Sequence, residues 1–292
     1  MDKLVVPHAA AEVIKKHDFT FRKKYGQNFL IDGYVLEKII RGAGVTKEDA
    51  VLEIGPGIGT MTQMLCETAG HVIAVEIDDK LIPILNETLE PYENVTLIHD
   101  DIIKADIKGL IEKYAGGRPV KVIANLPYYI TTPIIMNFFE NDIPVHSLTL
   151  MVQKEVGQRM KAEPGSKDYG ALSLAIKYYA DAYIVANVPR NCFMPRPNVD
   201  SVVIRLTRYT EPPVEVQDEK LLFRLIRAAF NQRRKTLVNG INNSPDLAFT
   251  KQQIEEAIVS IGRDAAVRGE ALRIEEFALL ANEFSKIEGS VK

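Results

Sequence analysis

Short apolar runs alternate with stretches of helical periodicity along most of the chain. The apolar runs predict strands, which we place at residues 51–54, 72–75, 95–98, 120–124, 148–152, 183–188 and 201–206. Between the first two runs, Met61, Met64 and Leu65 recur at helical spacing, and Gly70 is a natural end for that helix. This alternation is typical of an α/β domain with a mainly parallel sheet.

The pattern changes twice towards the C-terminus. No helical stretch separates the last two predicted strands, so we expect them to pair antiparallel at the sheet edge. After the Tyr-Thr-Glu-Pro-Pro segment at 209–213 the strand signals stop, and amphipathic helices are expected at 221–230, 252–261 and 274–284. We therefore predict a Rossmann-like domain over 1–210, with an N-terminal arm, and a small all-helical domain over 211–292.

Composition places the chain among ordinary globular proteins. Of its 292 residues, 46% are hydrophobic and 26% are charged. No apolar run approaches the roughly 20 residues that span a bilayer, and the N-terminus lacks a secretory pattern, so a cytoplasmic protein is expected. Cys66 and Cys192 match no metal spacing, Cys66 is expected in the core, and no metal is expected.

The formal net charge of −3 argues against a uniformly basic nucleic-acid protein, but cations are clustered. Runs of three occupy 22–24 and 233–235, and Arg190, Arg196, Arg205 and Arg208 follow one another over nineteen residues. Such a run is often only a solvated surface. In a chain that also carries residues suited to a base, contacts with phosphates become the favoured interpretation.

A glycine-rich loop, Glu53-Ile54-Gly55-Pro56-Gly57-Ile58-Gly59, follows the first predicted strand and opens a helix. Gly55 and Gly57 allow a ligand to approach the backbone, although the spacing is not that of the dinucleotide fingerprint. A tight turn without a ligand is the alternative. Glu76 ends the next strand about twenty residues later, where a carboxylate can accept hydrogen bonds from both hydroxyls of a ribose. Asp100 and Asp101 end the third strand and could accept from an adenine amine, or simply cap a helix.

The segment Asn125-Leu126-Pro127-Tyr128 ends the fourth predicted strand. If the Asn125 amide oxygen and the Leu126 carbonyl accept the two N–H groups of an adenine N6, that nitrogen can direct its lone pair at an electrophile. Pro127 shapes the turn and Tyr128 offers a ring on which a flipped base can stack. A simple turn is the alternative. Together with the glycine loop, the segment points to methyl transfer from S-adenosylmethionine to an adenine.

Several further segments carry a resemblance to a known family. They are 24–30 (Lys-Tyr-Gly-Gln-Asn-Phe-Leu), 153–156 (Gln-Lys-Glu-Val), 193–202 (Phe-Met-Pro-Arg-Pro-Asn-Val-Asp-Ser-Val) and 229–237 (Ala-Phe-Asn-Gln-Arg-Arg-Lys-Thr-Leu), besides 53–59 and 125–128. With them the chain resembles the ribosomal RNA adenine dimethyltransferase family. The resemblance implies a Rossmann-like methyltransferase domain and N6,N6-dimethylation of two adjacent adenines near the 3′ end of 16S rRNA, in the small subunit or its assembly precursor. It also implies a monomer, a role in subunit biogenesis and RNA contacts by the helical domain.

The resemblance also implies roles for single residues. Asn28 and Leu30 would close over the methionine part of the cofactor, and Gly55, Glu76, Asp101 and Asn125 would complete its pocket. Phe193 would be a second aromatic against the target base, opposite Tyr128. As alternatives, Phe193 could be a core residue, and residues 27–28 could cap a helix that begins near Asp32.

Three other functions remain open at this point. A 23S rRNA dimethyltransferase carries similar motifs, although the extended C-terminal domain and the Phe-Met-Pro-Arg-Pro run favour the 16S enzyme. The same fold could serve as a non-catalytic ribosome-assembly or transcription factor, against which Glu76, Asp101, Asn125 and Tyr128 argue. A nicotinamide dehydrogenase is disfavoured by the glycine spacing and because none of the five histidines lies in a motif.

Overall fold

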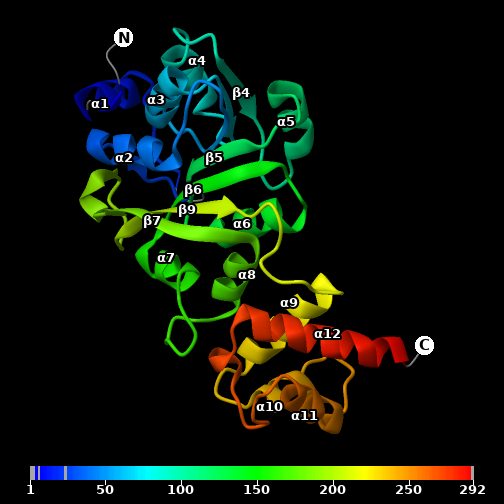
Figure 1. Ribbon diagram of the computed structural model, residues 1–292. Coiled ribbons are helices and arrows are strands. Elements are labelled where there is room, and N and C mark those ends of the chain that lie inside the picture. Colours follow the sequence, from blue (N-terminus) through cyan, green and yellow to red (C-terminus); the bar gives the residue numbers. More distant parts are fainter. Residues whose placement is uncertain (1–3, 6, 23–24, 291–292) are drawn as a thin grey trace. The chain divides into compact units, whose positions relative to one another are not determined.

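The computed structural model describes residues 4–5, 7–22 and 25–290, and they form two compact units (Figure 1). The first unit comprises Met1–Gly157 and Tyr183–Arg208, and the second comprises Gln158–Ala182 and Tyr209–Lys292. The two units are described separately below.

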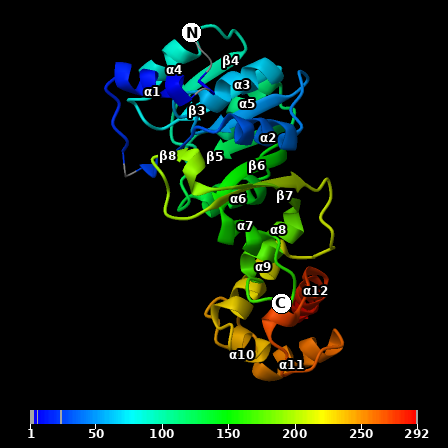
Figure 2. The same cartoon turned by 90° about the vertical axis from the view of Figure 1, so that its left-hand side faces the viewer.

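The first unit is built on a seven-stranded sheet. Its strands are β2 (Ala50–Ile54), β3 (His71–Glu76), β4 (Val95–His99), β5 (Val120–Asn125), β6 (Val145–Gln153), β7 (Ala180–Val188) and β9 (Ser201–Arg208). The spatial order is β4-β3-β2-β5-β6-β9-β7. Strands β2 to β6 pair parallel, and β9 pairs antiparallel with β6. All seven predicted strands and the antiparallel last strand are confirmed, and β9 lies between β6 and the edge strand β7 (Figure 1). Figure 2 shows the same sheet after a turn of 90°.

Helices bury both faces of this sheet. On one face α2 (Gly33–Ala43) and α3 (Thr60–Thr68) share a core with alternate strand residues such as Val51, Ile123 and Met151. Cys66 belongs to this core, as predicted. The intervening strand positions, among them Leu52 and Val122, are also fully buried. Such burial on both sides is expected of a parallel sheet. The remaining helices of this unit are α1 (Pro7–Lys16), α4 (Ile82–Thr88), α5 (Ile107–Ala115) and α6 (Thr131–Glu140).

The N-terminal arm reaches the site through a two-stranded sheet that sequence patterning did not predict. Its strands, β1 (Phe29–Leu30) and β8 (Phe193–Met194), pair antiparallel, with Leu30 opposite Phe193. Two residues are too short to give an alternating pattern, and the partners are separated by more than 160 residues in the sequence. Helix α2 begins after Asp32, whose side chain accepts from the Val35 amide, so residues 27–28 are not its cap.

The second unit is helical, with α8 (Ala171–Tyr179), α9 (Glu219–Asn231), α10 (Leu237–Asn242), α11 (Lys251–Ser260) and α12 (Ile274–Ser290). The three predicted helices correspond to α9, α11 and α12. Residues 158–182, assigned by sequence to the first domain, group with this unit instead. The reason is packing, because the Tyr169 hydroxyl donates to the Leu272 carbonyl at 2.8 Å and its ring lies edge-on to Phe230.

Shorter elements among the described residues include α7 (Lys154–Met160) and the 3₁₀ helices at Arg190–Cys192 and Gly269–Ala271. Among the described residues, no helix is both long and apolar enough to span a bilayer. No group of three or more His, Cys, Asp and Glu side chains with metal-binding geometry occurs in the same part of the chain.

Candidate functional site

The strand order reverses between β2 and β5, and this is where the predicted site residues meet. From β2 the chain continues to β3 and β4 on one side, and from β5 it continues to β6 on the other. The connections therefore diverge and leave a crevice beyond the carboxyl ends of β2 and β5. The glycine loop follows β2 and Asn125 ends β5, so both border this crevice. A cavity at this point is lined by residues 25–30, 53–61 in part, 76–77 and 125–128.

Positive backbone angles explain the glycines of the loop. Gly55 and Gly57 have φ values of +69° and +62°, a region that favours glycine. A Cβ on Gly57 would also lie 3.1 Å from the ring of Phe29. The loop leads into α3, whose N-cap, Gly59, has no side chain to satisfy the first amides. The amides of Gly55, Gly57 and Gly59 are bonded to the Val75 carbonyl, the Glu76 carboxylate and the Pro56 carbonyl respectively. The turn therefore brings a side-chain-free backbone to the cavity wall, which a ligand can approach closely.

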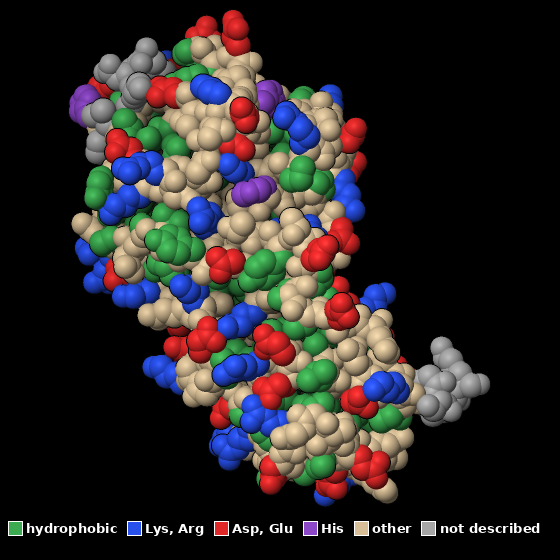
Figure 3. All heavy atoms as spheres, in the orientation of Figure 1, with side chains coloured by type: hydrophobic (Ala, Val, Ile, Leu, Met, Phe, Trp, Pro, Cys, Tyr) green, Lys and Arg blue, Asp and Glu red, His purple; other side chains and the backbone are tan. Residues whose placement is uncertain are grey.

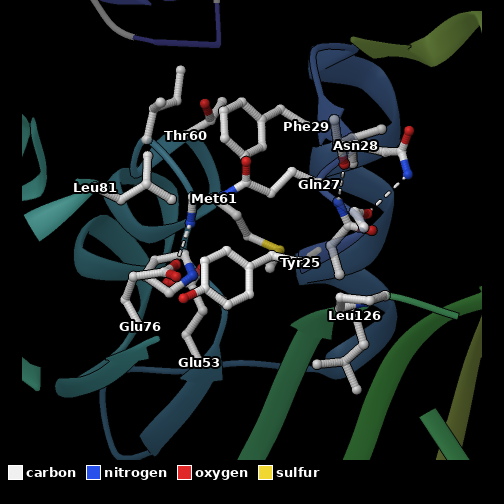
Figure 4. Close-up of a pocket in the computed structure, with 18 of the residues that line it drawn as sticks. Tyr25, Gln27, Asn28, Phe29, Glu53, Thr60, Met61, Glu76, Leu81 and Leu126 are labelled. Carbon is white, nitrogen blue, oxygen red and sulfur yellow. Dashed lines mark hydrogen bonds between the residues drawn. The ribbon is translucent and has the colours of Figure 1, made fainter. Parts of the chain in front are cut away.

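Glu76, the last residue of β3, turns its carboxylate back to the loop. Its Oε2 accepts from the Gly57 amide at 3.3 Å (Figure 4), and its Oε1 accepts from the Asp78 amide at 2.8 Å. The side chain is only 4% exposed, and burial raises its pKa to about 7, against the opposing effect of these two amides. The glycine loop thus fixes the Glu76 carboxylate beside the cavity, where it is expected to bind a ribose.

A second buried carboxyl, Glu53 on β2, was quoted as part of the loop motif but given no role by sequence. It is fully buried, and neither oxygen has a hydrogen-bond partner among the described residues. Burial, together with the nearby Glu76, raises its pKa to about 8, although the neighbouring Thr62 hydroxyl opposes the shift. At neutral pH Glu53 is therefore mostly a neutral acid beside the cavity. Register places it on the same sheet face as Glu76, because Glu53 pairs with Ala74.

Asn125 is fixed by the N-terminal arm. Its Nδ2 donates to the Asn28 backbone carbonyl at 2.8 Å, which leaves Oδ1 as the acceptor that the site can offer. Leu126 and Pro127 follow it on the cavity wall. Gly26, at φ +56°, packs so closely that a Cβ there would be 3.1 Å from the Pro127 side chain. The arm and the Asn-Leu-Pro-Tyr segment are thus in direct contact.

Tyr128 is held by a single polar contact. Its hydroxyl lies 2.7 Å from Oγ of Ser201, the first residue of β9. Burial raises the pKa of Tyr128, and the bond to Ser201 only partly offsets this effect. The phenol is therefore neutral at physiological pH. The contact fixes one edge of the ring and leaves the orientation of its face to the surrounding backbone.

Two aromatic rings and a thioether fill the middle of the cavity. Figure 4 shows the rings of Tyr25 and Phe29 and the sulfur of Met61 directed inward, with Glu76 and Glu53 at its floor. The cavity measures about 110 Å³. Sites for small molecules commonly occupy roughly 300 Å³ or more, so a nucleoside-sized ligand requires these arm side chains to move. Sequence gave no role to Tyr25 or Met61, although apolar residues beside a glycine loop could have indicated one.

Two predicted site residues lie apart from this cavity. Asp101 follows β4, and its Oδ1 accepts from the Ile103 amide at 3.1 Å, as a turn cap does. Phe193 is 4% exposed and belongs to the core that includes Leu30 and Cys192. Neither residue lines the cavity. The cap and the core packing are the alternatives that sequence left open for these two positions.

The predicted basic clusters are only partly available for phosphates. Arg22 pairs with Asp78 at 2.8 Å and Asp79 at 2.7 Å, while Lys23 and Lys24 lie outside the described residues. In the helical unit Arg233 is bound to Glu270 at 2.9 Å and to the Ser166 carbonyl at 3.0 Å. Arg234 and Lys235 are exposed. On the face drawn in Figure 3, basic and acidic side chains are interspersed.

Comparison with known proteins gives consistent matches along the chain. The family model described as ribosomal RNA adenine dimethylase matches residues 18–286. A protein of Lachnoclostridium phytofermentans called ribosomal RNA small subunit methyltransferase A is 63% identical over 94% of this chain and 96% of its own length. A protein of the same description from Alkaliphilus oremlandii is 50% identical over 98% and 99%.

Two solved structures share the fold over most of the chain. A dimethyladenosine transferase from Plasmodium falciparum is 26% identical, with a TM-score of 0.71 over 87% of this chain and 96% of that one. The 23S rRNA methyltransferase ErmE is 24% identical, with a TM-score of 0.67 over 88% of this chain and 100% of that one. The second likeness concerns the fold alone.

Proposed function

The chain belongs to the ribosomal RNA adenine dimethylase family, and we propose that its substrate is the small-subunit rRNA, in which it dimethylates N6 of two adjacent adenines near the 3′ end. It is an S-adenosylmethionine-dependent methyltransferase, as its family, its fold and the 63% identity to a small-subunit rRNA methyltransferase support. The observation that carries the proposal is the bond from Asn125 to the Asn28 carbonyl, which joins the base-handling segment to the arm at the cavity.

The chemistry proposed for Asn125 follows from that bond. With Nδ2 engaged by Asn28, Oδ1 can accept one N–H of an adenine amine, and the Leu126 carbonyl can accept the other. Two acceptors favour the pyramidal, positively charged nitrogen of the transition state over the flat ground state, and this difference lowers the barrier. No strong general base is needed, because the alkylated nitrogen is acidic and loses its proton to water.

The residues around the cavity fit the cofactor. When bound, S-adenosylmethionine supplies an electrophilic sulfonium methyl. We propose that Glu76 accepts hydrogen bonds from the ribose hydroxyls, that the glycine backbone of the 55–59 loop lets the ligand approach closely, and that Asn28 and Leu30 cover its methionine part. The buried Glu76 carboxylate, aimed at the loop amides, supports this assignment. A role for Phe193 would require rearrangement of core packing, whereas Asp101 would have to act from outside the cavity lining with the oxygen that the turn does not use.

The substrate assignment favours the 16S enzyme over the 23S one. The relatives at 63% and 50% identity are both described as small-subunit methyltransferases, whereas the 23S enzyme shares only the fold. We also propose that the helical domain contacts the ribosomal particle and that the protein is a cytoplasmic monomer. The exposed Arg234 and Lys235 support the first of these proposals.

One experiment tests the function directly. Small subunits from a strain without this modification are incubated with the protein and labelled S-adenosylmethionine, and the modified nucleosides are mapped by mass spectrometry. We expect N6,N6-dimethyladenosine at two adjacent positions near the 3′ end of 16S rRNA. Label at 23S rRNA in whole ribosomes, with none in small subunits, would instead assign the alternative enzyme. If the protein binds the particle tightly but transfers no labelled methyl group, the result would favour a non-catalytic assembly factor.

A further inference from the structure

A second hollow shares no lining residue with the cavity described above, which we call the cofactor cavity. It measures about 400 Å³ and is lined by Gln153, Lys154, Glu155, Arg190 and residues 198–200, and we call it the neighbour pocket. A third hollow of about 440 Å³ connects the two, since it shares Tyr128 with the cofactor cavity and Gln153, Asn198 and Val199 with the neighbour pocket. Both volumes fall in the range of about 300–1,000 Å³ that is typical of small-ligand sites.

Strand register explains why these hollows adjoin. Asn125 pairs with Met151 on β6, and Gln153 lies two residues further along the same strand, so it stands on the same face and at the same sheet edge. Gln153 in turn pairs with Ser201 on β9, whose hydroxyl contacts Tyr128. Tyr128 and Gln153 therefore both adjoin Ser201, and both line the connecting hollow.

The polar side chains of the neighbour pocket are available to a ligand. Gln153 is half-buried, and its amide has no hydrogen-bond partner in the described part of the chain. Asn198 and Lys154 are exposed, and their side chains likewise make no hydrogen bond or ion pair with those residues. A ligand in the hollow can therefore bond to these groups without breaking an internal contact. By contrast, Asp200 is engaged, because its Oδ1 accepts from the Arg190 amide at 3.1 Å.

We propose that the neighbour pocket binds the nucleotide adjacent to the target adenine. This inference rests on the proposed function and adds a specificity site to it. Side-chain amides suit an adenine edge, since the oxygen accepts from N6 and the nitrogen donates to N7. Gln153 and Asn198 provide two such amides, and Val199, 42% exposed, gives an apolar surface for the face of a base. Lys154 and Arg190 lie where the phosphate of that nucleotide can be paired.

This arrangement explains how the enzyme could require a second adenine next to the target. An enzyme that acts on two adjacent adenines can have either one in the reaction position while the other is its neighbour. A pocket that prefers adenine next to the target then selects the pair over an isolated adenine. Guanine in the same place would offer O6, an acceptor, where the amide oxygen needs a donor.

The test uses the full-length protein and small subunits whose 16S rRNA carries guanine in place of one of the two target adenines. For each such substrate, kcat/KM at the remaining adenine is measured and compared with kcat/KM at the same adenine in natural rRNA. We expect the wild-type protein to prefer the natural neighbour by about tenfold for at least one of the two positions. That position shows whether the pocket takes the 5′ or the 3′ nucleotide.

The variants Gln153→Ala and Asn198→Ala then test whether these two amides cause the preference for adenine. Each should lower kcat/KM on natural rRNA but barely change it on the guanine substrate, so that the preference shrinks to about threefold or less. Gln158→Ala is the matched control, because Gln158 is exposed on α7 and lies outside the hollow. Affinity for S-adenosylhomocysteine should be unchanged in all three variants, which shows that each is folded.

Two results would overturn the inference. One is a wild-type protein that methylates the remaining adenine equally well with either neighbour. The other is a variant that loses the same factor on both substrates, as a structural role for Gln153 predicts. A wild-type protein that methylates no rRNA adenine at all contradicts the proposed function instead, so the two failures are distinguishable.

Discussion

The hydroxyl of Tyr128 lies 2.7 Å from Oγ of Ser201, so the aromatic residue that follows β5 is fastened to the first residue of β9. The two residues are far apart in sequence, and β6 separates their strands in the sheet. Because β9 enters the sheet antiparallel, its first residue arrives at the same edge as the carboxyl ends of β5 and β6. The antiparallel strand therefore supports the site from within the sheet, between β6 and the edge strand β7.

Substitutions of Tyr128 separate its ring from its hydroxyl. Tyr128→Phe keeps the stacking surface and loses one hydrogen bond, which is worth about 1 kcal/mol, so kcat should fall by roughly fivefold. Tyr128→Ala removes a stack worth roughly 1–3 kcal/mol and the alignment of the base with it, so turnover should fall far further. Single-turnover methylation of small subunits measures both, with calorimetry of S-adenosylhomocysteine as the control for cofactor binding. If the Ala variant works at the wild-type rate, Tyr128 does not stack on the base.

Removal of the Glu76 carboxylate should weaken the cofactor and leave RNA binding intact. Glu76→Ala loses charge-assisted hydrogen bonds to the ribose, and we expect a loss of roughly 1.5–3 kcal/mol in binding free energy. Titration calorimetry with S-adenosylhomocysteine gives this value. Glu90→Ala, at an exposed position outside the cavity, is the matched control and should bind normally. Equal affinities for the two variants would remove Glu76 from the site.

The two buried carboxyls predict an unusual pH dependence of stability. Burial raises the pKa of Glu53 to about 8 and that of Glu76 to about 7, while in the unfolded chain both titrate near their ordinary value of about 4.3. The native state therefore binds more protons than the unfolded state between these values. The free energy of unfolding must then fall as pH rises from about 5 towards 8.5.

An isosteric neutral variant tests this directly. Glu53→Gln keeps the shape of the side chain but cannot ionise, so the part of the decline that belongs to Glu53 should disappear, on the order of 2–4 kcal/mol across that range. Urea unfolding at a series of pH values measures it. Glu48→Gln, at an exposed position, should keep the wild-type profile. A wild-type protein whose stability rises between pH 6 and pH 8.5 contradicts a protonated Glu53.

The strands and the loops after them could be predicted because their signals are local. An apolar run followed by Gly55, Glu76 or Asn125 gives both the strand and the edge at which it ends, and strand order then brings these residues together. Phe193 and Asp101 were different, because their surroundings are set by distant segments. Phe193 is buried through the pairing of β8 with the two-residue strand β1, and no local pattern reveals that contact.

The role of a charge run also depends on distant segments. A run of cations shows that charge is present, but the positions of its acceptors come from elsewhere in the chain. Arg22 is paired with Asp78 and Asp79, which lie more than 50 residues away. Ionic partners of this kind are fixed by tertiary structure, so composition alone cannot distinguish a phosphate contact from an internal bond.

Within the 233–235 run, a cation with internal bonds can be compared with two cations that could contact phosphates. Arg233 is bonded to Glu270 and to the carbonyls of Ser166 and Lys167, all within the helical unit. Arg233→Ala should therefore lower the free energy of unfolding of that unit by about 1–2 kcal/mol. Thermal or urea unfolding checks this, and the salt dependence of particle binding should stay as in the wild type, because an engaged guanidinium displaces no phosphate counterions.

The adjacent pair should behave in the opposite way. Arg234 and Lys235 are exposed, and neither makes a hydrogen bond or ion pair from its side chain to the described residues. If both contact phosphates, the double variant Arg234→Ala/Lys235→Ala should unfold like the wild type but bind small subunits more weakly. The slope of log K against log salt should flatten by about one to two, since each phosphate contact contributes close to one. Phosphate contacts carry no sequence information, so methylation should still occur at the same adenines.

A double variant with an unchanged slope would exclude the pair from the RNA surface. A flattened slope in Arg233→Ala would mean that its internal bonds open when the particle binds.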